Sequence, residues 1–202
     1  MRPLTEAETR TLFTKLATYT GRSLSTLIAP PSSPSSAGDR LVFRLHGSRV
    51  YIVPEQTANL ATSIPRSALL SLGTCLGKFT KTGKFRLHIT ALDVIAPYAR
   101  CRVWVKRNGE MPFLYGGHVL RAHVGRWAEP EEGTVGEHEG VVVMGGDDAP
   151  LGFGVTARST ADARKLDPTA IVVFRQADVG EYLREVSGAT LRGWVAIFWL
   201  LD

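Results

Sequence analysis

Residues 73–88 constrain the fold most, because apolar and cationic side chains alternate there around a turn signal. Residues 80–83 (Thr-Lys-Thr-Gly) supply the turn, with Gly83 able to adopt a positive φ. Successive side chains of a strand point to opposite faces, so the residues beyond the turn divide into two sets. The apolar set is Phe85, Leu87 and Ile89, and the polar set is Lys84, Arg86 and His88. The pattern predicts a β-hairpin with an apolar underside and a cationic upper face.

The cationic face of this hairpin is the first candidate binding site. It carries Lys78, Lys81, Lys84 and Arg86, with no carboxylate in the stretch. A polyanion lying across a sheet suits such a face, because clustered cations bind nucleic-acid phosphates with release of counterions. A solvated face on an ordinary edge hairpin is the alternative, since lysines also protect sheet edges from further pairing.

Charge is distributed unevenly along the 202 residues. Residues 1–99 hold 12 Lys and Arg against 5 Asp and Glu, whereas residues 100–202 hold 12 against 14. The overall net charge of +5 therefore arises from the first half, which has a net charge of +7. Hydrophobic residues make up 44% of the chain, which is typical of a packed globular protein.

The first half reads as an antiparallel sheet with a few short helices. Thr5 and Glu8 form a capping-box pattern before a helix that ends near Gly21. Residues 41–53 predict a second hairpin, and a helix follows Pro54 with Leu60 facing inward. The Pro- and Ser-rich residues 30–38 predict a flexible loop. This pattern predicts an α+β arrangement for residues 1–96.

The second half predicts a small β-barrel built from short strands. Residues 102–106 alternate, residues 107–110 read as a turn, and residues 113–120 read as a short helix. Residues 170–174 form a continuous apolar run, which predicts a buried strand. Pro97 marks the boundary, so the domains are predicted at 1–96 and 97–185, with an atypical apolar tail at 186–202.

Motifs for catalysis or cofactor binding are weak. Residues 152–157 match GxGxxA, but Val155 and Thr156 read as continuing strand where a dinucleotide site needs a helix. The five histidines and two cysteines have no metal-ligand spacing, and no nucleophile motif is present. No signal peptide or membrane span is expected, because the start is polar and the longest apolar run is short. The expectation is a non-enzyme without cofactor or metal.

A second group of cations is the other candidate site. Its members are Arg121, Arg126, Arg158, Arg164 and Lys165, and Arg175 follows them in the chain. If the second half is a small barrel, these side chains can share one face for RNA contact, and solvated surface charge is the alternative. The intervening residues 129–148 carry seven carboxylates, so this acidic segment is expected to face solvent or another protein.

Several longer stretches resemble the Nip-seven family of pre-60S ribosome biogenesis factors. They are MRPLTEAETR, SLGTCLGKFTKTGKFRLHITALDVIAPYA, LYGGHVL, PLGFGV and DPTAIVVFRQADVGEYLR. The resemblance covers most of residues 1–184 and implies an N-terminal α/β domain followed by a C-terminal PUA domain. It also implies RNA contacts after the glycine pair and near the last strands, where the second group of cations lies. The tail after residue 185 departs from the family and reads as a gene-model artefact or as a partner-binding or barrel-capping strand.

The resemblance further implies a non-enzymatic adaptor needed for 27S pre-rRNA processing in the nucleus and nucleolus. Its implied partners are pre-rRNA of the large subunit, pre-60S assembly factors and exosome components, with a monomeric chain and no membrane. Two alternatives remain at this point. One is a protein-binding scaffold in pre-ribosomes without direct RNA contact, and the other is an accessory subunit of an RNA-modifying enzyme.

Overall fold

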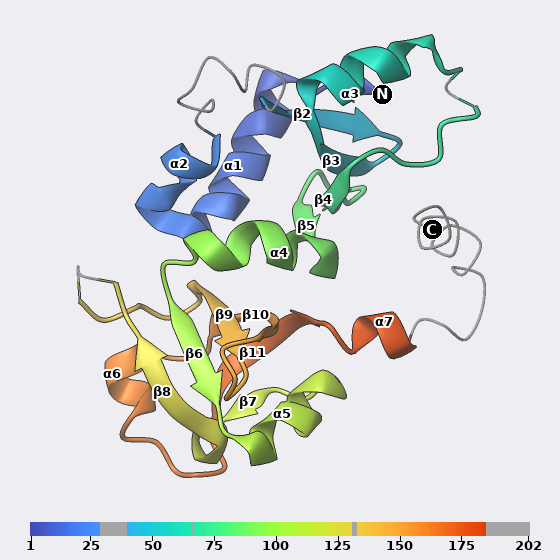
Figure 1. The fold of residues 1–202 in the computed structure, drawn as a ribbon. Coiled ribbons are helices and arrows are strands. Elements are labelled where there is room, and N and C mark those ends of the chain that lie inside the picture. Colours follow the sequence, from blue (N-terminus) through green and yellow to red (C-terminus); the bar gives the residue numbers. More distant parts are fainter. Residues whose placement is uncertain (29–39, 66, 131–132, 185–202) are drawn as a thin grey trace.

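The computed structural model describes residues 1–28, 40–65, 67–130 and 133–184. These residues form two β-sheets, one from each half of the chain, with helices packed between and around them (Figure 1). The predicted Pro/Ser loop and the apolar tail lie outside the described residues. No helix among the described residues is long and apolar enough to cross a membrane.

The first half is an antiparallel sheet with helices on both faces, as the sequence predicted. Its strand order is β1-β2-β3-β4-β5, so β5 is an edge strand. The strands are β1 (Arg2–Pro3), β2 (Leu41–His46), β3 (Arg49–Pro54), β4 (Thr74–Phe79) and β5 (Phe85–Leu87). The α-helices are α1 (Glu6–Thr20), α2 (Leu24–Ile28), α3 (Glu55–Leu60) and α4 (Leu92–Ile95). Short 3₁₀ turns follow at Gly21–Ser23, Ala61–Ser63, Ile89–Ala91 and Ala96–Tyr98.

Helix α1 begins and ends where the sequence predicted. Thr5 and Glu8 exchange the two hydrogen bonds of a capping box, and Gly21 ends the helix with a φ of 55°. Arg2 donates to the Glu8 carboxylate, and this hydrogen bond together with the cap lowers the pKa of Glu8 to about 2. The local pattern was therefore enough to fix this element.

Two local predictions in the first half were wrong. Leu60 does not face inward, because it is 77% exposed at the end of α3, and Ala58 is the residue of that helix that packs on the sheet. The alternation after the turn ends at Leu87. His88 leaves the strand, is half-buried, and its Nδ1 accepts from the backbone N–H of Thr90 to begin a 3₁₀ turn. The cationic face of β5 thus contains Arg86 and not His88.

The second half is a curled half-barrel, which confirms the predicted small barrel. Its strand order is β7-β11-β10-β9-β6-β8, with only the β6–β9 pair parallel among the described strands. The strands are β6 (Arg102–Val105), β7 (Val119–Leu120), β8 (Val124–Ala128), β9 (Gly140–Met144), β10 (Pro150–Thr156) and β11 (Ile171–Asp178). The α-helices are α5 (Arg107–Leu114), α6 (Thr160–Ala163) and α7 (Glu181–Arg184), and a 3₁₀ turn spans Arg121–His123.

Helix α5 corrects two predictions. Residues 107–110 form its first turn and not a separate β-turn, and the helix stops at Leu114 before the glycine pair. Residues 119–120 are strand β7 and not helix. The apolar run at 170–174 is only partly buried: Val172 and Val173 are inside, whereas Phe174 is 37% exposed. A half-barrel leaves one face of such a strand uncovered, which a run of apolar residues cannot reveal.

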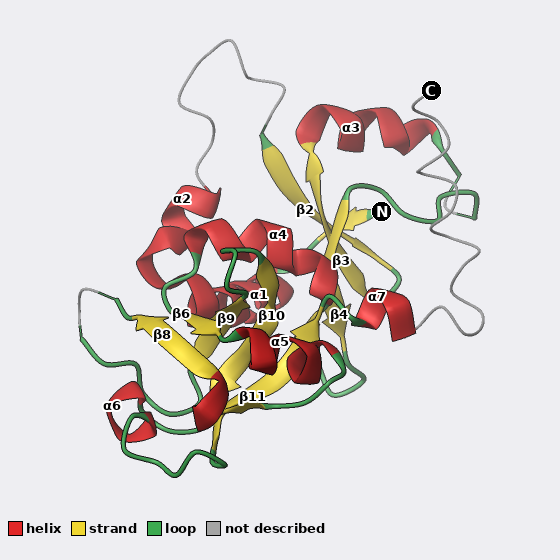
Figure 2. Cartoon of the chain, turned by 60° about the horizontal axis from the view of Figure 1, so that its bottom comes forward, coloured by secondary structure: helices red, strands yellow, loops and turns green. Residues whose placement is uncertain are grey.

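The two halves share one hydrophobic core. Leu12, Leu16 and Tyr19 of α1 pack in the same cluster as Val142 of β9 and Phe153 of β10. Both views show α1 and α4 lying where the two sheets approach each other (Figures 1 and 2). Tyr19 also donates a hydrogen bond to Gln176 Oε1 of β11 at 3.0 Å. Helix α1 therefore fixes the position of β11 relative to the first sheet.

Candidate nucleic-acid interface

A row of basic residues crosses four adjacent strands of the first sheet. The antiparallel register places His46 opposite Arg49, Arg49 opposite Lys78, and Lys78 opposite Arg86. Residues directly opposite in a sheet project from the same face, so these four side chains lie side by side. We call them the basic row. Helix α3 covers the Tyr51 and Val53 end of the same face, which leaves the Arg49 end open to solvent.

The basic row has no internal counterion. Arg49, Lys78 and Arg86 are exposed, and among the described residues none of them forms an ion pair with a carboxylate. Like charges directly opposite one another destabilise a sheet. The arrangement therefore costs the free protein some stability, and a bound polyanion would relieve that cost.

The predicted hairpin lysines extend this surface. Lys81 and Lys84 are exposed in and after the turn, where Gly83 has a φ of 76° as the turn requires. The Thr80 hydroxyl accepts from the Lys84 backbone N–H and donates to the Lys84 carbonyl, which fixes the turn. All four predicted residues of the hairpin thus lie on one connected, exposed segment. Their contact with RNA stays a prediction.

The second group of predicted cations is only partly brought together. Arg121, Arg126 and Arg164 line one hollow of about 230 Å³ between β8 and the end of α6. Arg158 follows β10 and is exposed, and Lys165 is exposed just after α6. The prediction that these residues share a face therefore holds for three of the five, as far as the lining of this hollow shows.

These arginines are already engaged within the protein. Arg126 pairs with Asp148 at 2.8 Å and stacks on Trp104, with its guanidinium carbon 3.9 Å from the ring centre. Arg164 pairs with Glu129 at 3.0 Å. The Arg121 guanidinium donates to the Arg164 carbonyl.

Arg158 also pairs with a carboxylate, at a longer distance than Arg126 and Arg164. Its guanidinium lies 3.5 Å from Glu137 Oε1. The acidic segment 129–148 thus supplies the partner carboxylates for Arg126, Arg158 and Arg164. It contacts the chain's own arginines, where the sequence had indicated solvent or another protein.

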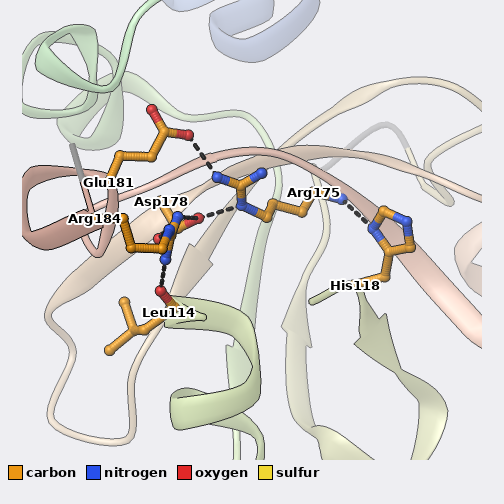
Figure 3. Close-up of polar contacts among 6 residues, drawn as sticks. All are labelled: Leu114, His118, Arg175, Asp178, Glu181 and Arg184. Atoms are coloured by element: carbon orange, nitrogen blue, oxygen red, sulfur yellow. Dashed lines mark hydrogen bonds and ion pairs between the residues drawn. The ribbon is translucent and has the colours of Figure 1, made fainter. Parts of the chain in front are cut away.

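A buried carboxylate organises the end of β11 near α7. Asp178 is 0% exposed and accepts from both Arg175 and Arg184, the latter at 2.9 Å to each oxygen (Figure 3). Arg175 also donates to Glu181 Oε1 at 2.6 Å, and Arg184 donates to the Leu114 carbonyl. Burying a carboxylate is tolerated only when it is paired in this way. The network holds Arg175 in a fixed orientation beside the first sheet.

Catalytic and metal-binding chemistry finds little support in the described residues. No group of three or more His, Cys, Asp or Glu gathers in a way that could hold a metal ion. Cys75 and Cys101 are free thiols; burial raises the pKa of both, that of Cys101 to about 12, so neither is an activated nucleophile. Gly152 and Gly154 lie inside β10, where a side chain would collide with the backbone of β11. The GxGxxA match therefore reflects close strand packing and not a phosphate-binding turn.

Sequence reasoning missed Arg49, His46 and Lys15. Arg49 and His46 join the basic row only through strand register, which local alternation does not reveal. The Nζ atom of Lys15 in α1 lies 3.5 Å from Gln176 Oε1 of β11. Lys15 lines the same hollow as Lys78 and Arg86 of the first sheet. The net charge of +7 in the first half was the only signal for Arg49 and Lys15, and it gave none for His46, which is counted as neutral.

Solved structures confirm the class of fold. A PUA-domain protein of Aeropyrum pernix matches with a TM-score of 0.54 at 15% identity, over 90% of this chain and 87% of that chain. A hypothetical protein of Pyrococcus horikoshii matches with a TM-score of 0.55 at 13% identity, over 93% of this chain and 99% of that chain. The described chain is thus a PUA-type half-barrel preceded by an α+β sheet module.

Sequence comparisons then identify the family. Residues 1–89 match the NIP7/UPF0113 pre-PUA domain, and residues 101–187 match the UPF0113 PUA domain. The chain belongs to the NIP7/UPF0113 family, which confirms the resemblance drawn from the sequence.

Curated relatives match along almost their whole length. The chain is 59% identical to the 60S ribosome subunit biogenesis protein nip7 of Schizosaccharomyces pombe and 56% identical to the corresponding protein of Saccharomyces cerevisiae. Each alignment covers 92% of this chain and 97% of the relative. The homolog of Xenopus tropicalis is 54% identical over 91% of this chain and 97% of its own.

Proposed function

We propose that this protein is an RNA-binding assembly factor of the large (60S) ribosomal subunit. It is a non-enzymatic adaptor that acts on pre-rRNA of the large subunit and is needed for 27S pre-rRNA processing. It works in the nucleus and nucleolus as a monomer, together with pre-60S assembly factors and exosome components. The names of its relatives and the PUA-type fold support this function.

The observation that carries the proposal is the exposed basic row without internal counterions. An RNA backbone supplies a line of negative charges that matches a line of cations, and the repulsion between opposite cations is relieved on binding. The hairpin lysines Lys81 and Lys84 continue the same surface beyond the row. We therefore assign Lys78, Lys81, Lys84 and Arg86 as the principal RNA contacts of the first half.

The five cations of the second half form a weaker contact. Three of them, Arg126, Arg158 and Arg164, must exchange their carboxylate partners for RNA phosphates, which reduces the net gain from each of these contacts. The same pairing argues against the scaffold alternative, because Glu129, Glu137 and Asp148 are engaged with the chain's own arginines. Nothing in the described residues specifically favours the alternative that the protein is an accessory subunit of an RNA-modifying enzyme.

The test is a charge reversal of the hairpin. Lys78, Lys81, Lys84 and Arg86 are changed together to Glu, and binding to a short single-stranded RNA is measured by fluorescence anisotropy at several salt concentrations. We expect weaker binding and a salt slope reduced by about 3, because each lost phosphate contact on a single strand removes about 0.7 from the slope.

A matched control separates local contact from net charge. The control variant reverses four other exposed cations, Arg10, Arg40, Lys106 and Arg107, and so has the same net charge. We expect it to retain most of the slope. If the two variants lose affinity and slope equally, the hairpin is a solubilising face and this assignment is wrong.

A further inference from the structure

A groove opens between the two halves at the free edge of β5. Its volume is about 650 Å³, which is within the range of pockets that hold small ligands. Residues of α1, of β4 and β5, and of β11 line it, so both halves contribute to its walls. Lys78 and Arg86 belong both to this groove and to the basic row, which makes the two surfaces continuous.

The charge in this groove is unbalanced. Its lining contains Lys15, Lys78, Arg86 and Arg175 but only one carboxylate, Glu181. Glu181 pairs with Arg175, and Asp178 pairs with the same arginine (Figure 3). Lys15, Lys78 and Arg86 therefore face the groove without a carboxylate partner among the described residues.

Lys15 is the most unusual of these cations. It is half-buried, and burial lowers the pKa of its ammonium group. Its ammonium lies 3.5 Å from Gln176 Oε1 and 5.4 Å from the centre of the Tyr19 ring, both distant and uncharged partners for a group with three donors. A cation taken partly out of water without a counterion is costly, so an anion entering the groove would be bound favourably.

We propose that this groove binds a phosphate group of the RNA backbone between Lys15, Lys78 and Arg86. The inference rests on the proposed RNA-binding function and extends it from one sheet to the junction of both halves. An RNA strand that lies along the basic row enters the groove at Arg86 and reaches Lys15. Arg175 keeps its orientation through Asp178 and closes the far wall. RNA contact in the groove thus bridges the pre-PUA and PUA parts of the chain.

The first experiment compares two single substitutions on one helix. Lys15→Gln and Arg10→Gln each remove one positive charge from α1, and only Lys15 lines the groove. With a short single-stranded RNA, we expect Lys15→Gln to weaken binding several-fold and to reduce the salt slope by about 0.7, the value for one phosphate contact. Arg10→Gln should keep the slope of the unaltered protein. Equal slopes for the two variants would overturn the groove site while leaving RNA binding by the basic row intact.

The second experiment tests occupancy of the groove directly. Lysines of the unaltered full-length chain are acetylated with an amine-reactive reagent in the presence of RNA, of an acidic peptide, or of neither. The modified sites are read by mass spectrometry. We expect RNA to protect Lys15 and Lys78. Lys106, which directly follows β6, is exposed and does not line the groove, so it should remain reactive.

The outcomes of the two experiments distinguish the groove from the general function. Protection of Lys78 without Lys15 would restrict RNA to the sheet and refute the groove site. Protection of Lys15 by an acidic peptide but not by RNA would make the groove a protein-binding site and overturn the proposal. Absence of any salt-dependent RNA binding by the unaltered protein would refute the proposed function itself.

Discussion

The two halves of the chain carry the same number of Lys and Arg residues, 12 in each, but use them differently. In the first sheet the Lys and Arg residues of the basic row and the hairpin lysines are exposed and have no carboxylate partner among the described residues. In the half-barrel three of the four arginines of the candidate site are bound to Glu129, Glu137 and Asp148. A polyanion binds most strongly to cations that are not already paired with carboxylates. A count of basic residues therefore overestimates the capacity of the second half to bind RNA and underestimates that of the first half.

The largest effect on the stability of the half-barrel is expected at Asp178, the buried carboxylate that pairs with two arginines. Changing Asp178 to Asn removes the negative charge that Arg175 and Arg184 share and leaves two cations facing each other. We expect a loss of about 3 kcal/mol in the free energy of unfolding, at the lower end for breaking a buried pair because both arginines retain some exposure. Urea unfolding followed by circular dichroism measures it.

Asp167→Asn serves as the control for this variant. Asp167 is exposed and forms no ion pair among the described residues, so its loss should change stability by less than about 0.5 kcal/mol. If Asp178→Asn is equally mild, the network in Figure 3 is not a structural anchor and the contrast between the halves weakens.

Local sequence patterns predicted where helices, strands and turns lie better than they predicted which side chains of each element are buried. The capping box at Thr5, the turn at Gly83 and the alternation in β6 depend on neighbours in sequence, and each was found as expected. Leu60 and Phe174 were placed inside because they are apolar, yet their exposure depends on what other elements cover. Tertiary coverage decides burial, and periodicity alone cannot supply it.

The candidate site shows the same division. The hairpin cations were visible because they are close in sequence and share one face. Arg49 joins them through register with Lys78, and Arg126 is neutralised by Asp148 from 22 residues away. Both facts are long-range, so the sequence indicated where cations lie but not which of them are available. The predicted division of the chain between residues 96 and 97 stays a prediction.

Removing the partner carboxylates should make the second half resemble the first. The triple variant Glu129→Gln, Glu137→Gln and Asp148→Asn releases Arg164, Arg158 and Arg126 from their pairs. We expect tighter binding to single-stranded RNA and a salt slope steeper by up to about 2, if each released arginine adds about 0.7. Anisotropy titrations between about 50 and 200 mM salt cover the range where the slope is well defined.

The control for the triple variant changes net charge equally without releasing those arginines. Glu6→Gln, Glu55→Gln and Asp167→Asn remove three carboxylates that pair with no cation among the described residues; Glu6 and Asp167 are exposed and Glu55 is half-buried. A slope that rises no more in the triple variant than in this control would show that Arg126, Arg158 and Arg164 do not contact RNA. The RNA surface would then be confined to the first sheet and the groove.

The smallest expected effect is that of a single substitution in the basic row, Lys78→Gln. It tests the row because it should raise the stability of the protein and lower its affinity for RNA. Lys78 faces Arg49 on one side and Arg86 on the other, so Lys78→Gln removes two like-charge pairs. We expect the free energy of unfolding to rise by about 0.2–1 kcal/mol while RNA affinity falls. Lys81→Gln, in the turn and with no cation opposite, should leave stability unchanged. Because exposed charges are screened within about 3 Å at 1 M salt, the gain in stability should disappear there. A surface that serves only solubility would show the gain in stability without the loss of RNA affinity, because the repulsion between the opposite cations does not depend on a ligand. The fall in affinity is therefore the result that assigns the basic row an anionic occupant.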